Sequence, residues 1–446
     1  MKIDDSRDDL RMTDDKMSRR KYVAVAGAAA AAAAIGGAAY YFGTQKPATT
    51  EKIRVFSIDI PEGVYLAAIT EDFPQAELVN IPFLESMEKG LTELVSESGY
   101  FDVMLWHQLW LPQVGESKLA MDVQEEFDMT SAERNDLEPG ILNVCDYETA
   151  DGTRASMWPV RPCIDVNNYY RTDLFEEHGL TPPNTIDEYI DSATELNDPP
   201  NRYGTTSIAT KSLDSFLRLA MWMWANDGGY FGDGGWQEGT IINEPESVEA
   251  LQMRVDFFQK YKVWPDEVLN CESDEWVKMF STGKLAMAPN WPYQHYTCSD
   301  PEKSQIVGKY KAKVMPKWVN HISGVGGWGV IVPKACKHKE TVSEYLRFIT
   351  NYENQKWMGL NIISPTARIS VNKDPDIIAT APPDLWEATY FQYENPDVPC
   401  PNARVAHPKY NEFVQITTTA GQDALLKQKT PQEACDWAAR KIEDLM

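Results

Sequence analysis

The sequence lacks the short motifs that mark the commonest catalytic and metal sites. It contains no G-x-S-x-G, no H-E-x-x-H and no C-x-x-C, which argues against an elbow-type serine hydrolase, a zinc protease and a zinc knuckle. Its 6 histidines are scattered as single residues. A glycosidase would need two facing carboxylates, for example Asp165 with Asp59 or Glu62, but nothing local marks either partner as a raised-pKa acid. We therefore expect no enzyme activity, no cofactor and no metal.

Positive charge is also scarce. The 446 residues include 42 Lys and Arg against 67 Asp and Glu, which gives a formal net charge of −25. Such a surface repels phosphate backbones and anionic lipid heads. Nucleic acid is therefore not an expected partner. Anionic solutes are disfavoured at long range as well, although a local arginine could override that repulsion.

One uncharged run stands out, near the N-terminus. Arg19, Arg20 and Lys21 precede residues 22–43, which carry no charge and are about long enough to span a bilayer core. The basic cluster keeps its own end in the cytoplasm. The stretch SRRKY resembles a twin-arginine export signal. We expect a cytosolic segment 1–21, a signal peptide or uncleaved anchor 22–43, and a polar linker 44–52, followed by an extracytoplasmic protein.

Export would permit disulfides. Of the 7 cysteines, Cys145 with Cys163 and Cys271 with Cys298 are the first pairs to test. The odd number leaves at least one thiol unpaired within a monomer, and free buried cysteine remains the alternative for each.

After the linker, short β-branched runs alternate with helical patterns. IRVFSIDI, AELVNIPF and FDVMLW read as strands separated by two helices, which predicts a parallel sheet covered on both faces. Further on, Gly324, Gly326 and Gly329 match G-x-G-x-x-G. A dinucleotide loop must open a helix, but here VIVPK follows and reads as a strand. We expect instead a loop that comes close to another group, with Trp328 projecting from it.

Four segments, taken in order, resemble one family. PVRPCIDVNNYYRTDLFEEHGLTPPNTIDEY, FSTGKLAMAPNWPY, GGWGVIVPKACKHKETVSEYLRFIT and KTPQEACDWAARKIEDL are similar to extracellular solute-binding proteins of ABC importers, in the carbohydrate-binding group that includes maltose-binding protein. The resemblance covers nearly all of residues 53–446.

The resemblance implies an α/β fold of two lobes with mainly parallel sheets, joined by a hinge that the chain crosses three times. Lobe 1 would comprise 53–164 and 307–352, and lobe 2 would comprise 165–306 and 353–446. It also implies a monomer that captures a small molecule, a sugar or oligosaccharide, in the cleft and delivers it to ABC permease subunits in the membrane. A sensor that presents the loaded ligand for signalling is the alternative.

A sugar offers apolar C–H faces and a rim of hydroxyls, so indole rings should bury the faces while carboxylates, amides and arginine hold the hydroxyls. Asp59 and Glu62 follow the first strand, where ligand contacts are common. By resemblance, the other expected contacts are Trp106, Asp165, Asn290, Trp291, Trp328 and Arg368. A place in the core is the alternative for each tryptophan, and a structural contact between lobes is the alternative for Arg368.

Overall fold

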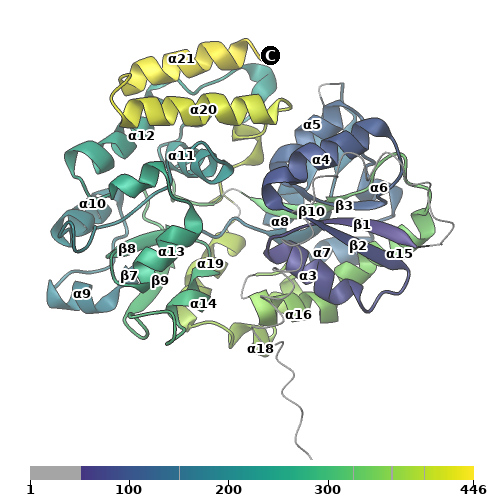
Figure 1. Ribbon diagram of the computed structural model, residues 1–446, viewed down its shortest axis with the longest axis horizontal. Coiled ribbons are helices and arrows are strands. Elements are labelled where there is room, and N and C mark those ends of the chain that lie inside the picture. The colour runs from purple at the N-terminus through teal and green to yellow at the C-terminus, as the bar shows by residue number, and fades with distance from the viewer. Residues whose placement is uncertain (1–51, 150, 325, 363–364, 396) are drawn as a thin grey trace, which may run out of the picture.

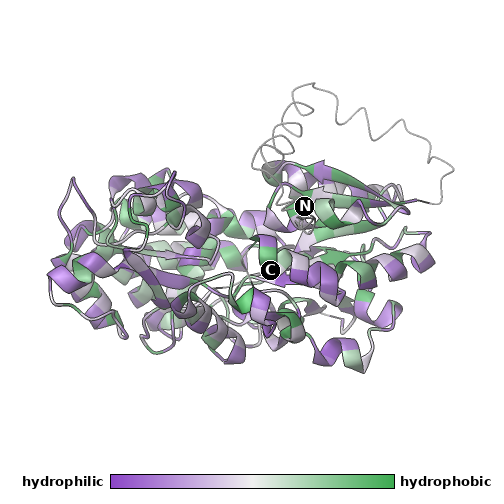
Figure 2. Ribbon diagram, turned by 90° about the horizontal axis from the view of Figure 1, so that it is seen from below, coloured by the Kyte–Doolittle hydropathy of each residue, from purple (hydrophilic) through white to green (hydrophobic). Residues whose placement is uncertain are grey.

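A computed structural model describes residues 52–149, 151–324, 326–362, 365–395 and 397–446. The expected segments 1–21 and 22–43, and nearly all of the linker 44–52, lie outside these residues. Two lobes lie side by side, and their helices carry hydrophobic and hydrophilic residues in alternation (Figure 1, Figure 2). Within the described residues, no helix has the length and apolar composition needed to cross a membrane.

The first lobe is built on a five-stranded sheet of order β2-β1-β3-β10-β6. Strands β1 (Ile53–Ile58), β2 (Ala76–Ile81) and β3 (Val103–His107) are parallel. Helices α3 (Pro61–Thr70) and α4 (Phe83–Ser96) connect them. The strand–helix–strand–helix–strand prediction for this part of the chain is therefore confirmed.

Strand β10 (Gly327–Ile331) runs antiparallel to both β3 and β6 (Trp158–Pro162). Gly324 and Gly326 precede β10 in the expected loop, but Trp328 and Gly329 lie within the strand and not in that loop. The glycines lead into a strand and not into a helix, as expected. They permit close packing, because a Cβ on Gly326 would lie 2.9 Å from the Cβ of Cys163, and one on Gly329 would lie 2.7 Å from that of Met157.

The second lobe contains a three-stranded sheet of order β8-β7-β9. Strand β7 (Asn167–Arg171) is antiparallel to β8 (Met287–Asn290) and to β9 (Tyr310–Val314). The expectation of mainly parallel sheets is thus wrong for this lobe and for β10, because β7 and β10 each lie between two strands that run in the opposite direction.

Two predicted boundaries are also wrong. β9 pairs with β7, so the chain returns to the first lobe after residue 314 rather than at 307. Helix α16 (Tyr352–Ile362) packs against α3 of the first lobe, so residues just after 353 do not belong to the second lobe. That lobe resumes at α19 (Pro383–Glu394), which packs on β9 and β7.

Helix starts follow local hydrogen-bonding rules. Thr185 and Thr430 each cap a helix through a reciprocal capping box, with Glu188 and Glu433 respectively. Both follow the T-x-x-E pattern that is typical of a capping box. They fix the beginning of α10 (Ile186–Glu195) and of the last helix, α21 (Pro431–Glu443).

Helices α11 (Leu213–Ala225), α12 (Pro245–Val255) and α20 (Tyr410–Leu425) pack with one another, and α21 packs on α12 and α20. This helical layer faces the first lobe across the gap between the ribbons in Figure 1. Its helix α20 begins at Tyr410, which lies beside Trp110 of the first lobe.

The remaining elements of the first lobe are η1 (Gln108–Trp110), α5 (Leu111–Glu116), α6 (Val123–Glu126), α7 (Ser131–Asn135), α8 (Pro139–Val144), β4 (Asp146–Glu148), β5 (Arg154–Ser156), α15 (Lys339–Ile349), α17 (Ile369–Asn372) and α18 (Pro375–Ile378). Those of the second lobe are α9 (Thr172–Glu177), η2 (Trp236–Glu238), η3 (Asp256–Lys260), η4 (Asp266–Leu269), α13 (Ser273–Ser281), α14 (Gln294–Cys298) and η5 (Asn402–Arg404).

All 7 cysteines are free thiols. The suggested pairs Cys145–Cys163 and Cys271–Cys298 are therefore wrong. Cys145 is fully buried and would touch a Cβ on Gly329, whereas Cys163 packs at Gly326. The two thiols thus occupy different places along β10, which the sequence spacing could not reveal.

Candidate ligand-binding cleft

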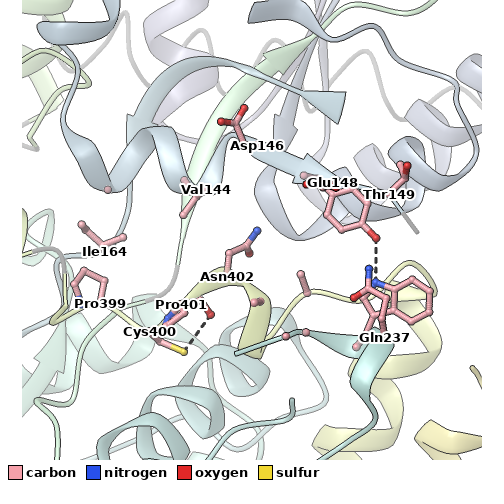
Figure 3. A pocket seen from close by; sticks show the side chains of 17 residues that line it. Val144, Asp146, Glu148, Thr149, Ile164, Gln237, Pro399, Cys400, Pro401 and Asn402 are labelled. Carbon is pink, nitrogen blue, oxygen red and sulfur yellow. Dashed lines mark hydrogen bonds between the residues drawn. The ribbon is translucent and has the colours of Figure 1, made fainter. Parts of the chain in front are cut away.

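A cavity of about 720 Å³ lies where the two lobes meet (Figure 3). The first lobe contributes α8, β4 and the residue after it, and the second contributes the loops 234–237 and 399–406. Ile164, in the segment that links β6 to β7, closes the hinge side. The lining residues are Gly140, Val144, Asp146, Tyr147, Glu148, Thr149, Ile164, Gly234, Gly235, Trp236, Gln237, Pro399, Cys400, Pro401, Asn402, Ala403 and Ala406.

A hydrogen bond crosses this cavity from lobe to lobe. The Nε1 of Trp236 donates to the hydroxyl of Tyr147 over 3.0 Å, and that hydroxyl donates to Oε1 of Glu116 over 2.8 Å. Burial, and secondarily the Glu116 carboxylate, raises the pKa of Tyr147. The hydroxyl therefore stays protonated and holds the two lobes together at this point.

Oxygen acceptors prevail among the polar side chains of the cavity. Asp146 accepts from Arg154 over 2.7 Å through Oδ2, while its buried Oδ1 has no hydrogen-bond partner among the described residues. The Oδ1 of Asn402 is likewise unpartnered. Glu148 adds a second carboxylate, and the lining residues include no lysine or arginine. The cavity can therefore accept hydrogen bonds from hydroxyl groups.

A second polar cluster lies where β8 ends beside the hinge. The indole Nε1 of Trp291 donates to the carbonyl of Cys163 over 3.2 Å. The guanidinium of Arg218 lies 4.6 Å from the Trp291 ring centroid. Asn290 accepts from the backbone N–H of Trp291 and donates to Oε1 of Gln294 over 2.9 Å. Trp291 thus connects the second lobe to the linking segment.

Asp165 is a buried carboxylate in that linking segment. It is 0% exposed, and neither carboxylate oxygen has a hydrogen-bond partner among the described residues. Burial raises its pKa to about 6, although the charge of Arg161 opposes the shift. Arg161 forms a buried ion pair with Glu62, whose Oε1 also accepts a weak hydrogen bond from the thiol of Cys163 over 3.8 Å.

Trp328 and Trp106 both belong to the first lobe but occupy different environments. The Trp328 ring meets His107 and Trp110 edge-on at 4.8 and 5.7 Å. Trp110 in turn lies beside Tyr410 of the second lobe. Trp106 is 0% exposed, and its ring lies so close to Gly90 of α4 that a Cβ there would be 2.6 Å away. Its ring therefore fills the core of the first lobe.

The other two predicted contacts have structural partners. Asp59 is exposed and accepts from the backbone N–H of Phe83 at the start of α4. Arg368 binds Oδ2 of Asp136 over 2.7 Å and donates to the carbonyl of Thr350 over 2.6 Å. These partners lie within the first lobe, so Arg368 fastens that lobe internally and does not join the two lobes.

Four of the eight predicted contacts lie together around the linking segment, namely Glu62, Asp165, Asn290 and Trp291. Trp328 lies on the nearby strand β10. Trp106, Asp59 and Arg368 lie at other places in the first lobe. None of these eight residues lines the 720 Å³ cavity. Sequence reasoning missed its aromatic pair and the polar residues of its second-lobe loops. The glycine-rich stretch 226–236 that ends in Trp236 was the available signal, because such a loop brings its backbone and side chains close to other groups.

Two α/β lobes with polar and aromatic side chains between them define the class of two-lobe periplasmic binding proteins. Solved structures share this fold. Maltose-bound MalE3 of T. maritima has a TM-score of 0.73 at 23% identity, covering 89% of this chain and 100% of that one. A ribitol complex of an ABC transporter solute-binding protein from Agrobacterium radiobacter K84 has a TM-score of 0.75 at 22% identity, covering 90% and 100%.

The chain belongs to the family of bacterial extracellular solute-binding proteins, whose family model matches residues 60–356. A probable amino-acid ABC transporter periplasmic-binding protein, y4oP of Sinorhizobium fredii, is 24% identical and covers 90% of each chain. An arabinooligosaccharide-binding protein of Bacillus subtilis is 24% identical over 42% of each chain. The predicted family and two-lobe fold are thereby confirmed, and the protein is a bacterial extracellular solute-binding protein.

Proposed function

We propose that this protein captures a sugar or oligosaccharide between its lobes and delivers it to ABC permease subunits in the membrane, acting as an extracytoplasmic monomer. One observation carries the proposal: the 720 Å³ interlobe cavity joins aromatic rings to carboxylate and amide acceptors. Its volume lies within the range of about 300–1,000 Å³ typical of small-molecule sites. Structural neighbours solved with maltose, ribitol and D-mannitol support the same ligand class.

The mechanism is a shift between open and closed forms about the linking segment. A ligand favours the closed form only to the extent that it binds it more tightly than the open one. In the closed form, Trp236 reaches Tyr147 and Trp291 reaches the Cys163 carbonyl. A ligand held by both lobes adds to these contacts, and the permease then recognises the closed shape.

Within this mechanism, Asp165 accepts ligand hydroxyls, since both of its oxygens lack other partners. Trp291 and Trp328 cover apolar faces of the ligand, and Asn290 orients Trp291 through its backbone N–H. Glu62 holds the linking segment through Arg161. The acceptors of the cavity bind further hydroxyls, so that an extended ligand reaches from the linking segment to Tyr147.

A thermal-shift screen followed by calorimetry tests the proposal. The panel contains maltose, arabinooligosaccharides, ribitol, mannitol and a set of amino acids, because one relative is named as an amino-acid binder. We expect stabilisation by at least one carbohydrate or polyol, with micromolar affinity and a smaller radius of gyration in solution scattering. A screen in which amino acids bind and all carbohydrates fail would refute the proposed ligand class.

A further inference from the structure

Arg218 of α11 is a buried cation without a counter-ion. Its side chain is 4% exposed, and its Nε and Nη1 have no hydrogen-bond partner among the described residues. Its Nη2 makes one long contact of 3.5 Å, to Oδ1 of Asn290. Within the part of the chain that the structure describes, no carboxylate lies within ion-pair distance of this guanidinium.

Burying a guanidinium in this way lowers the stability of the folded protein. A guanidinium keeps its proton under all ordinary conditions, so it cannot escape burial by becoming neutral. An isolated buried charge is strongly unfavourable unless an opposite charge and hydrogen bonds compensate it. Burial lowers the pKa of Arg218. Asp214 is the acidic side chain that acts on it, but Oδ2 of Asp214 already accepts from Ser273 over 2.7 Å.

Arg254 shows how the same lobe satisfies a structural arginine. It is equally buried, at 2% exposed, and lies over the ring of Trp264 at 5.3 Å. Its guanidinium nevertheless donates to Oγ of Ser207 over 3.1 Å and to the carbonyl of Ile208 over 2.8 Å. Arg254 therefore has local acceptors, whereas Arg218 keeps two nitrogens available.

The surroundings of Arg218 reach the segment that links the two lobes. The guanidinium covers the ring of Trp291, and that indole reaches the linking segment at Cys163. Gln294 accepts a hydrogen bond from Asn290 through Oε1, and its buried Nε2 has no partner in the part of the chain that the structure describes. Arg218 and Gln294, on either side of Asn290, thus form a donor patch. Its three nitrogens without a partner among the described residues lie beside the aromatic ring that the proposed function assigns to the ligand.

We propose that the donor patch binds an anionic group of the solute, so that the transported ligand is an acidic carbohydrate, with Arg218 as its counter-ion. The inference rests on the proposed function and narrows its ligand class. It also explains how a chain of net charge −25 holds an anion. Screened long-range repulsion decays over about 8–10 Å in physiological salt, whereas a desolvated contact with a guanidinium is strong.

Calorimetry with matched ligand pairs tests the proposal on the wild-type protein. Each pair has the same ring and differs in one group: glucose with glucuronate, galactose with galacturonate, and galactobiose with digalacturonate. Glucose 6-phosphate and galactose 6-phosphate distinguish phosphate from carboxylate as the anion. We expect at least tenfold tighter binding of the acidic member of the best pair. Equal or tighter binding of the neutral members would overturn the proposal while leaving the sugar-binding function intact.

Variants then assign the preference to Arg218. In R218Q, affinity for the acidic ligand should fall at least thirtyfold, while affinity for its neutral partner changes less than threefold. R254Q is the matched control, because it removes a buried arginine over a tryptophan but should keep the preference for acid. A preference that survives in R218Q overturns the assignment. Binding of amino acids alone, with no sugar of either kind, would overturn both this inference and the proposed function.

Discussion

Trp106 and Trp291 stand at the same kind of place, each at the end of a strand in its own lobe, but they have different surroundings. Trp106 packs against Gly90 and Trp110 inside the first lobe. Trp291 has a guanidinium on its face and a hydrogen bond to the linking segment. The first is enclosed by its own lobe, and the second is held by groups that meet at the hinge. Position at a strand end is therefore insufficient to identify a ligand contact, and the partners of the ring are decisive.

The largest expected effect is the loss of stability when Trp106 is removed from the core of the first lobe. Trp106→Ala should lower the free energy of unfolding by about 3–5 kcal/mol, because it removes a large buried ring and leaves a cavity under α4. Urea unfolding followed by circular dichroism measures this loss. The folded fraction should bind its sugar with unchanged affinity. A strong loss of affinity with little loss of stability would instead return Trp106 to the ligand site.

The next effect concerns Asp165. Its pKa of about 6 lies above the unfolded value of about 3.9. The folded state therefore binds the proton more tightly, and stability falls as pH rises from about 4 through 6, then levels off. The difference corresponds to about 3 kcal/mol, because each pKa unit is worth about 1.4 kcal/mol.

Asp165→Asn removes this titration. Thermal unfolding without ligand should show a higher melting temperature than wild type at pH 7.5, and a smaller difference at pH 4.5. The conservative variant Asp59→Asn, at an exposed position, should leave the difference between these two pH values as it is in wild type. Identical pH profiles for wild type and Asp165→Asn would show that the buried carboxylate is compensated by a group it does not contact here.

Trp291→Ala tests whether the tryptophan beside the linking segment contacts the ligand. We expect sugar affinity to fall at least tenfold, equivalent to about 1.4 kcal/mol, because the ring that covers the ligand is lost. The stability loss should be smaller than for Trp106→Ala. Trp264→Ala is the control, because Trp264 also faces an arginine and is buried, yet it should change stability and not affinity. Calorimetry and thermal unfolding of both variants separate the two outcomes.

The sequence predicts local structure in this protein better than contacts between distant residues, and the reason is physical. Local signals predicted the strands β1, β2 and β3 and the strand that contains VIVPK, since each depends on neighbouring residues. The ion pair of Glu62 with Arg161 joins residues 99 positions apart. The contact of Tyr147 with Trp236 joins residues 89 apart. The first pair depends on how distant segments of one lobe pack, and the second on how the two lobes meet; no local pattern encodes either.

The same limit applies to the points at which the chain crosses from one lobe to the other. β9 resembles any short alternating strand, and only its pairing with β7 assigns it to the second lobe. Arg218 is similar: in the sequence it is one basic residue within an apolar helix, and a surface position would be the ordinary interpretation. Its burial over Trp291 becomes visible only when α11 is packed against the end of β8.

The smallest expected effect is at the hydrogen bond between Trp236 and Tyr147. Tyr147→Phe removes the hydroxyl that accepts from Trp236 and donates to Glu116. A single such hydrogen bond contributes about 1 kcal/mol net, so the closed form should lose about fivefold in population and ligand should dissociate faster. Trp236→Phe removes the same bond from the other lobe. If the bond is a lobe-to-lobe contact, the double variant should be little worse than either single one. Additive effects on the dissociation rate, measured by stopped-flow fluorescence, would mean that each residue acts through its own contact with the ligand.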